Sequence, residues 1–217
     1  LQRRPGRVAA EETGKHGARG RDPAFGLDLL PLDSHGGGDR NVDVERGPEG
    51  AIAETRDTSV VVREMFESAK ERVLVSTFAV YQPDAVFAGL ASRMDALPGL
   101  SVRLFLNVAR PYGSSESAEE LLAAFTKAFR DTWPGNRPPE VFFDPRSLAA
   151  GHGPRAVLHA KCVVVDGRRS FVTSANFTEA AQERNFELGL LVDDELLAKS
   201  IEGQFETLVE RQLVSAL

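Results

Sequence analysis

A histidine and a lysine stand two residues apart in a stretch that is typical of a β-strand. The stretch runs from Leu158 to Asp166 and ends in the turn-forming pair Asp166-Gly167. Because side chains alternate along a strand, His159 and Lys161 share one face, while the apolar residues between and after them point to the other. The pattern predicts one face packed on a core and an opposite face that presents an imidazole beside an ammonium. A structural histidine with a snorkelling lysine is the alternative interpretation.

Three further polar residues follow on the next two predicted strands. Ser174 and Asn176 share a face at the end of a strand over residues 170–176, which should pair back across the turn as a hairpin and bring them near His159. A hydroxyl, an amide and an ammonium beside one imidazole would suit a tetrahedral anion such as phosphate. Glu187 opens an apolar strand over residues 186–192, where its carboxylate could orient an imidazole.

This constellation resembles the HKD motif and the trailing GSxN element of the phospholipase D superfamily. The resemblance covers roughly residues 56–217, the size of a family member with a single motif. One departure is that Thr173 stands where the family usually has glycine. The residues that carry the resemblance are His159, Lys161, Asp166, Thr173, Ser174, Asn176 and Glu187.

The resemblance implies hydrolysis of a phosphodiester through a phosphohistidine, without a metal or other cofactor. In this family two HKD motifs meet at a twofold axis, and one histidine attacks phosphorus while the other protonates the leaving group. Residues 1–217 contain one such motif, so we expect a homodimer that pairs the two copies of His159. The paired histidines should differ in protonation and give a bell-shaped pH profile. Lys161 and Asn176 would hold phosphate oxygens with help from Ser174, and Glu187 would bond to a histidine Nδ1–H.

The motif aspartate and several loop residues each have a functional and a structural interpretation. Asp166 is either a direct participant or a turn former, and both interpretations stay open at this stage. Arginines in loops could rim the cleft and contact backbone phosphates, although a solvated surface arginine is the alternative. Arg155 and Arg184 are the two that we predict to bind substrate, and Tyr112 and His152 could stack on a base. The remaining loop arginines are Arg110, Arg146, Arg168 and Arg169.

Composition limits the classes of protein to consider. The formal net charge is −6, so any contact with nucleic acid must come from a local basic patch. The single cysteine, Cys162, falls on the packed face of the motif strand and is expected to be a small buried residue. No long apolar run or signal-peptide core is found, and we expect a cytoplasmic location.

Residues 1–55 differ in composition from the rest of the chain. They hold ten of the nineteen glycines, and Phe25 is their one aromatic residue. Such a segment buries too little apolar surface to offset its conformational entropy, so we predict a disordered tail. Residues 56–217 are predicted to form the phospholipase D-like domain.

Within that domain, strand and helix patterns alternate and are followed by one hairpin. This order predicts an α/β fold, namely an α/β/α sandwich around a mixed β-sheet. A capping box Ser117…Glu120 marks one helix start, and Asp193 or Asp194 should cap a closing helix whose inner face begins at Leu196. The predicted strands span residues 72–80, 101–107, 140–144, 158–166, 170–176 and 186–192, and other helices begin near residues 57 and 83.

The substrate class is less constrained than the chemistry. A compact chain with a single motif resembles the small bacterial nucleases of the family, so DNA or RNA is the first expectation. A phospholipid is the second, although the loops offer only Leu148-Ala149-Ala150 as an apolar element. A third is a non-catalytic, nucleic-acid-binding or scaffold subunit, because phospholipase D-like proteins of DISARM-type phage-defence systems are similar in size and motif.

Overall fold

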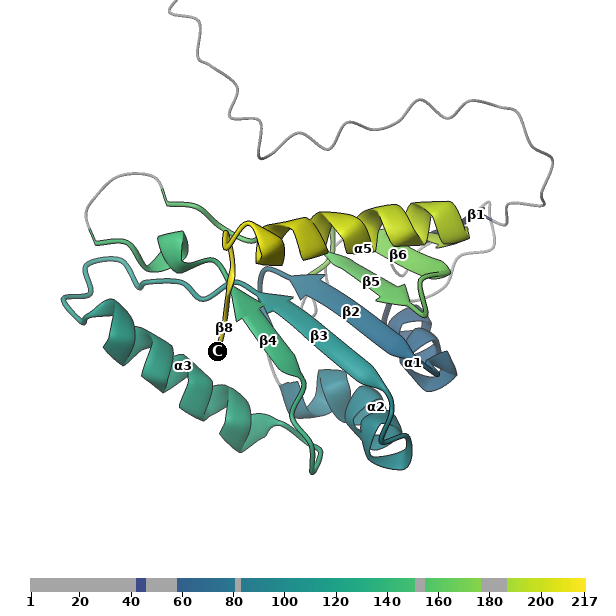
Figure 1. The fold of residues 1–217 in the computed structure, drawn as a ribbon, viewed down its shortest axis with the longest axis horizontal. Helices are drawn as coiled ribbons and strands as arrows, with labels where there is room; N and C mark the ends of the chain where they lie inside the picture. The colour runs from purple at the N-terminus through teal and green to yellow at the C-terminus, as the bar shows by residue number, and fades with distance from the viewer. Residues whose placement is uncertain (1–41, 46–57, 81–82, 151–154, 177–186) are drawn as a thin grey trace, which may run out of the picture. The chain divides into compact units, whose positions relative to one another are not determined.

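The computed structural model describes residues 42–45, 58–80, 83–150, 155–176 and 187–217. All of them belong to one compact unit, Asp39–Leu217. Its centre is a mixed sheet that has eight strands among the described residues, in the order β1-β7-β6-β5-β2-β3-β4-β8 (Figure 1). β2, β3 and β4 run parallel, and β5 joins β2 in the antiparallel sense. The strands span Val42–Glu45 (β1), Arg72–Thr77 (β2), Ser101–Leu106 (β3), Glu140–Phe143 (β4), Cys162–Val165 (β5), Arg169–Thr173 (β6), Gly189–Asp193 (β7) and Ser215–Ala216 (β8).

Helices cover both faces of this sheet, which confirms the predicted α/β/α sandwich. On one face, Phe66 of α1 and Phe87 of α2 pack with Val75 of β2 in the larger core cluster. On the other face, Phe205 of α5 packs with Phe105 of β3. The helices span Thr58–Ser68 (α1), Pro83–Ala96 (α2), Ala118–Thr132 (α3) and Glu195–Glu210 (α5), and a 3-10 turn η1 spans Pro145–Leu148.

The two predicted helix starts carry the expected caps. Ser117 and Glu120 form a complete capping box at α3, and Asp194 accepts a hydrogen bond from the Leu197 N–H at α5. The predicted inner face of α5 is wrong at its first turn, because the side chain of Leu196 is 75% exposed and the buried stripe begins at Ala198.

Three differences from the predicted boundaries bear on the site and on the extent of the domain. The motif strand is shorter than residues 158–166, because the β2–β5 ladder ends at the Ser76–Cys162 pair and the Ser76 hydroxyl then bonds the Ala160 carbonyl. The last predicted strand begins at Gly189, later than residue 186. Strand β1 lies within the predicted tail and pairs with β7, so the domain extends beyond the boundary drawn at residue 55. The rest of residues 1–55 lies outside the described residues.

The motif strand and β6 form the predicted hairpin. Asp166 and Gly167 both have positive φ, at 54° and 60°, and the Arg168 N–H donates to the Val165 carbonyl at 3.1 Å. Positive φ at both central residues is what a type I′ turn requires, and Asp and Gly tolerate it. Asp166 is thus a turn former.

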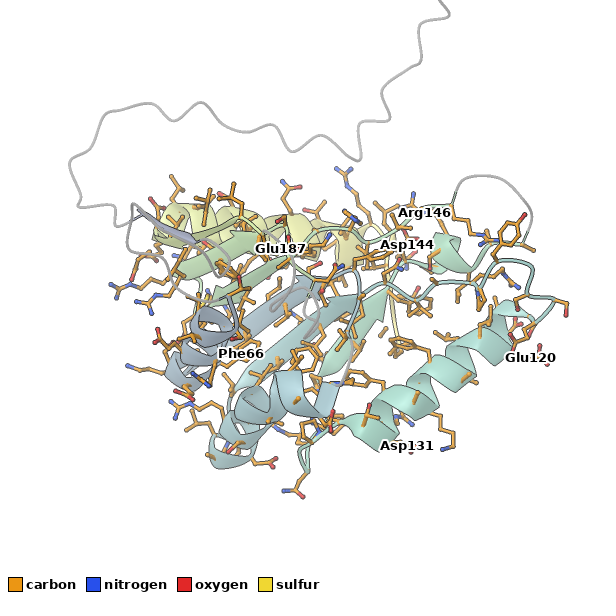
Figure 2. The ribbon with its side chains drawn as sticks, turned by 180° about the vertical axis from the view of Figure 1, so that it is seen from behind. Phe66, Glu120, Asp131, Asp144, Arg146 and Glu187 are labelled. Carbon is orange, nitrogen blue, oxygen red and sulfur yellow. The ribbon has the colours of Figure 1, made fainter. Side chains whose placement is uncertain are left out.

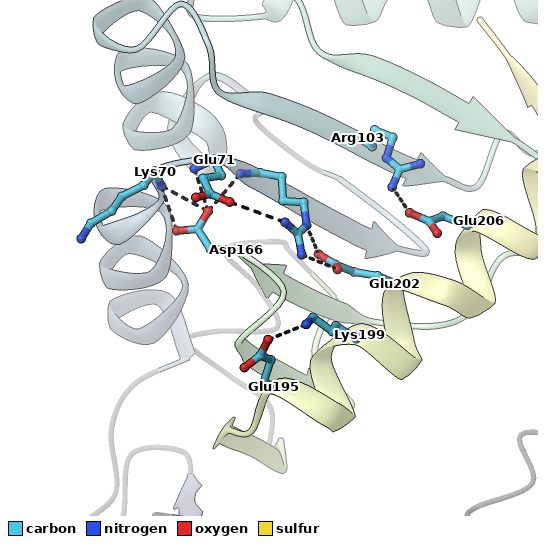
Figure 3. Close-up of polar contacts among 9 residues, drawn as sticks. Lys70, Glu71, Arg103, Asp166, Glu195, Lys199, Glu202 and Glu206 are labelled. Atoms are coloured by element: carbon cyan, nitrogen blue, oxygen red, sulfur yellow. Dashed lines mark hydrogen bonds and ion pairs between the residues drawn. The ribbon is translucent and has the colours of Figure 1, made fainter.

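The Asp166 carboxylate also fastens this turn to the start of β2 (Figure 3). It accepts three backbone hydrogen bonds, from the N–H groups of Lys70 (3.0 Å), Glu71 (2.8 Å) and Arg72 (2.9 Å). The Asp166 N–H in turn donates to the Arg72 carbonyl at 2.8 Å. We refer to this set as the Asp166 clamp. It joins the loop after α1 to the hairpin turn, which is 94–96 residues away in the chain.

The clamp continues through Arg72 to helix α5. The guanidinium of Arg72 donates two hydrogen bonds, at 3.0 and 3.1 Å, to the carboxylate of Glu202, a residue that is only 7% exposed. A Cβ atom at Gly167 would lie 1.9 Å from Arg72 Nη2, so a side chain there would displace this guanidinium, and the φ of +60° also favours glycine.

Cys162 lies in the core on the α5 face, as predicted. It is 4% exposed and packs in the cluster that contains Val164 and Leu158. Burial raises the pKa of its thiol to about 12, since the thiolate would lose its hydration.

Replacing Asp166 with alanine should lower the free energy of unfolding by about 2–4 kcal/mol, since three backbone donors lose a charged acceptor. Urea denaturation measures this change. Asp166→Asn is the matched control, because asparagine tolerates positive φ and keeps one acceptor oxygen, so its loss should be smaller. An alanine variant within about 0.5 kcal/mol of the wild type would contradict the clamp.

The Cys162 thiol predicts a pH dependence of stability. In the folded chain the thiol keeps its proton up to about pH 12, whereas in the unfolded chain it ionises near pH 9.0. The unfolded state therefore binds fewer protons above pH 9, and the wild type should lose about 1.4 kcal/mol per pH unit relative to Cys162→Ala. Urea denaturation of both proteins from pH 8 to pH 10.5 measures the difference, and parallel stability curves would refute it.

Candidate active site

The imidazole of His159 and the ammonium of Lys161 meet at the amino-terminal end of β5. Lys161 Nζ lies 3.3 Å from both ring nitrogens of His159 and donates to the His159 carbonyl at 3.0 Å. Both residues lie in the segment that enters β5, and Leu158 packs in the cluster on the opposite, α5 face. Leu158 and Cys162 thus lie on the packed face as predicted, whereas Ala160 is exposed, and residues 158–161 are outside the regular strand.

The burial of Lys161 distinguishes it from an ordinary surface lysine. The residue is 7% exposed, whereas His159 is exposed. Burial lowers the pKa of the Lys161 ammonium, and the charge of Glu187 offsets part of that effect. Among the residues that the structure describes, no carboxylate forms an ion pair with Lys161. A buried ammonium without a direct ion-pair partner is a favourable position for an anionic ligand.

The hairpin brings Ser174 to the same end of the sheet. The Thr173 N–H donates to the Lys161 carbonyl at 3.0 Å, so Ser174 begins the chain's exit from β6 beside the His159 segment. Its hydroxyl donates to Glu187 Oε2 at 2.5 Å and accepts from the Leu188 N–H at 3.1 Å. The departure at Thr173 has a structural use, because its hydroxyl accepts the Ala175 N–H at 3.0 Å.

Asn176 carries an unsatisfied polar atom. Its Oδ1 is buried and has no hydrogen-bond partner among the residues that the structure describes, a state that costs free energy in a folded protein. A 180° turn of the amide exchanges Oδ1 and Nδ2, so the position can present an acceptor or a donor to a ligand.

The contact of Glu187 with a histidine Nδ1–H stays a prediction. In the described part of this single chain, no hydrogen bond joins Glu187 to His159. Its carboxylate accepts a hydrogen bond from the Ser174 hydroxyl, and its negative charge raises the pKa of Lys161. Figure 2 labels Glu187, which follows the segment drawn in grey.

Asp166 takes no direct part in this cluster. It follows Val165 at the far end of β5 from Lys161, and the clamp uses its carboxylate. Within the described residues, no three side chains of His, Cys, Asp or Glu form a group that could hold a metal ion.

Phe78 is a neighbour of the site that sequence reasoning missed. Its ring centroid lies 5.1 Å from that of His159, with the planes tilted by 57°, and 5.9 Å from Lys161 Nζ. It follows β2, where an apolar residue is expected in a core and gives no separate signal. The ring limits the positions open to the imidazole and adds a cation–π contact to the lysine.

The two arginines predicted to bind substrate have different outcomes. Arg155 donates from Nε to the Ala149 carbonyl at 3.0 Å and from Nη1 to the Arg110 carbonyl at 3.2 Å, which ties two loops together. Its contact with substrate stays a prediction. Arg184 and His152 lie outside the described residues.

Three other loop arginines are engaged in ion pairs. Arg146, in η1, binds the buried carboxylate of Asp144, which caps η1, at 2.7 Å (Figure 2). Arg168 and Arg169 both bind Asp193, at 2.9 and 3.2 Å, at the end of β6 and β7 away from Ser174. These pairs favour the structural interpretation of the three arginines.

Comparison with known proteins identifies the family. The model of the cardiolipin synthase, PLD-like domain family matches residues 62–209. Cardiolipin synthase A of Pseudomonas fluorescens (strain SBW25) is 34% identical over 145 residues, which cover 64% of this chain and 25% of that protein. The chain thus spans about a quarter of the length of this curated relative.

Solved structures show the same fold. Nuc from Salmonella typhimurium, a phospholipase D family member, has a TM-score of 0.55 at 20% identity, over 82% of this chain and 99% of its own. NucT from Helicobacter pylori has a TM-score of 0.59 at 17% identity, over 82% and 100%. Phosphatidylserine synthase of Haemophilus influenzae Rd KW20 has a TM-score of 0.55 at 18% identity, over 82% and 40%.

None of the described helices is both long and apolar enough to cross a membrane. The family match over residues 62–209 covers most of the mixed-sheet sandwich. The chain belongs to the PLD-like domain family of the phospholipase D superfamily.

Proposed function

We propose that this chain is a metal-independent phosphodiesterase that forms a phosphohistidine on His159 and acts on nucleic acid. The observation that carries the proposal is the buried Lys161 ammonium, which has no carboxylate partner among the described residues and lies 3.3 Å from the His159 ring. An anion held by this ammonium would lie beside an exposed imidazole.

The chemistry proceeds in two displacements. A ring nitrogen of His159 attacks phosphorus, and the P–N bond forms as the P–O bond to the leaving oxygen breaks. A second histidine gives its proton to that oxygen, then takes a proton from water as the water oxygen attacks phosphorus and breaks the P–N bond. Lys161 and Asn176 hold the non-bridging oxygens with help from Ser174, and Glu187 supports the basicity of a histidine.

The second histidine would come from another copy of the chain. His159 is the one histidine among the described residues, and the attacking and protonating groups must lie on opposite sides of phosphorus. An exposed apolar row on the α5 face of β6 and β7 offers a surface for such a contact. It consists of Val172 (45% exposed), Leu188 (57%) and Leu190 (42%), and Val172 and Leu190 are cross-strand partners on β6 and β7. Leu188 directly follows Glu187, so the row ends at the edge of the sheet that carries the site.

A phospholipid substrate is the second candidate. The observation that favours it is the 34% identity to a protein named cardiolipin synthase A. The same four residues, His159, Lys161, Asn176 and Glu187, would serve, and the leaving oxygen would belong to a lipid headgroup. A non-catalytic binding subunit, of phage-defence type or another, is an outcome that the assay below would reveal.

Activity should depend on His159 and persist in a chelator. With EDTA present, labelled single- and double-stranded DNA, RNA and phosphatidylglycerol vesicles are each incubated with the wild type and with His159→Ala. We expect nucleic-acid cleavage that the substitution lowers by at least about 1000-fold, since the attacking group is lost. Lys199→Ala, at an exposed ion pair on α5, is the control and should keep full activity. Lipid turnover alone would select the second candidate, and tight binding without turnover would refute the enzyme.

The apolar row should control dimer formation. Leu190→Lys places a charge on it and should convert a dimer to a monomer in sedimentation velocity, with a loss of activity of at least about 100-fold, because the acid is then missing. Leu196→Lys is the matched control, since this leucine is 75% exposed at the start of α5. A wild type that is an active monomer would contradict the shared site.

A further inference from the structure

The loop between β3 and α3 presents an aromatic side chain to solvent. Tyr112 is 95% exposed, the largest exposed fraction among the large hydrophobic side chains that the structure describes. A single exposed aromatic on a loose loop would need no explanation. The loop that carries Tyr112, residues 107–117, is held by a buried arginine, and that changes the interpretation.

The tip of the loop is a defined turn. The Ser114 N–H donates to the Pro111 carbonyl at 3.2 Å, and Gly113 has φ of +75°. Glycine with positive φ at the third position is the requirement of a type II turn, which places Tyr112 at the corner. The Ser114 hydroxyl then bonds the Glu116 carboxylate at 2.9 Å. The ring is therefore presented from a fixed backbone.

Arg110 fixes the base of this loop. It is 8% exposed, and its guanidinium donates to the carbonyls of Leu148 (2.9 Å), Ser114 (3.4 Å) and Glu116. All three acceptors are neutral backbone groups, and within the described residues no carboxylate forms an ion pair with Arg110. The base of the loop thus keeps a positive charge.

The loop lies at the same edge of the sheet as His159. It leaves the carboxyl end of β3, which is parallel to β2, and His159 precedes β5, which is antiparallel to β2 (Figure 1). Arg155 connects the two regions, since its Nη1 donates to the Arg110 carbonyl at 3.2 Å. Arg155 is four residues before His159, which limits their Cα separation to about 14 Å. A strand with its phosphate at His159 would therefore reach Tyr112 within several nucleotides.

We infer that Tyr112 is a base-stacking position for a single-stranded nucleic acid whose backbone runs from the Arg110 loop to His159. This rests on the proposed function and names its substrate class as unpaired DNA or RNA. An exposed ring on a rigid corner beside a positive charge is the combination that binds unpaired strands without sequence preference. A lipid surface fits the loop less well, because its tip neighbours are Gly113, Ser114, Ser115 and Glu116.

The test measures binding in the full chain with His159→Ala, so that turnover does not interfere. A fluorescein-labelled single-stranded DNA oligonucleotide is titrated, and its anisotropy gives Kd. Tyr112→Ala should raise Kd by roughly 5- to 150-fold, the cost of one lost stacking contact. Tyr112→Trp and Tyr112→Phe should stay within about 3-fold of the parent, since each keeps a stacking face. Leu196→Ala, a truncation of another exposed side chain, is the control and should leave Kd unchanged.

Three results would overturn the inference. They are an unchanged Kd in Tyr112→Ala, a parent protein that does not bind the oligonucleotide, and a loss in Tyr112→Ala of binding to phosphatidylglycerol vesicles alone. Because the exposed ring makes no core contact, loss of folding cannot imitate the effect, and circular dichroism checks this. If Tyr112→Ala weakens binding while the His159-containing protein cleaves no substrate, the proposed function fails and the stacking position stands. If the protein cleaves DNA while Tyr112→Ala leaves Kd unchanged, the proposed function stands and the stacking position fails.

Discussion

The Asp166 clamp is the constraint on which the placement of the site depends. Strand β5 runs antiparallel to β2, and a shift of one residue between them would turn His159 and Lys161 toward the α5 face. Three backbone N–H groups at the start of β2 bind one carboxylate just after the end of β5. These bonds fix the register of the two strands at the end of β5 that is far from His159. The motif aspartate thus contributes to the site indirectly, because it fixes the strand register that places His159 and Lys161.

At the other end of β5 the structure holds groups that are costly without a ligand. Lys161 is a buried ammonium with no ion-pair partner among the described residues, and Asn176 has a buried oxygen without a hydrogen bond. A phosphate group would pair with the ammonium, and after a 180° turn of the Asn176 amide its oxygens would accept a hydrogen bond from Nδ2. The hydrogen bond from Ser174 to Glu187 and the ring of Phe78 hold the surroundings in place, so that the ligand meets a preformed arrangement.

Much of the fold could be predicted because it follows local patterns. Alternation along residues 158–166 assigned Cys162 to the core, Asp166-Gly167 indicated the hairpin, and caps at Ser117 and Asp194 fixed two helix starts. Features that depend on tertiary contacts were missed or wrong. The four-residue β1 gives too short a pattern within a glycine-rich segment, and Leu196 continues the helical stripe yet finds no partner there. The bond of Glu187 to Ser174 and the loop contacts of Arg155 depend on chain segments that only the folded sheet brings together.

The central claim is that His159 forms a covalent bond to phosphorus, and trapping that adduct tests it most directly. The protein is mixed with an oligonucleotide, quenched in alkali within the first turnover and digested for mass spectrometry. The account predicts a nucleotidyl or phosphoryl group on the peptide that contains His159, absent when His159→Ala is used. An adduct on Ser174, or rapid cleavage with no adduct on any peptide, would contradict it.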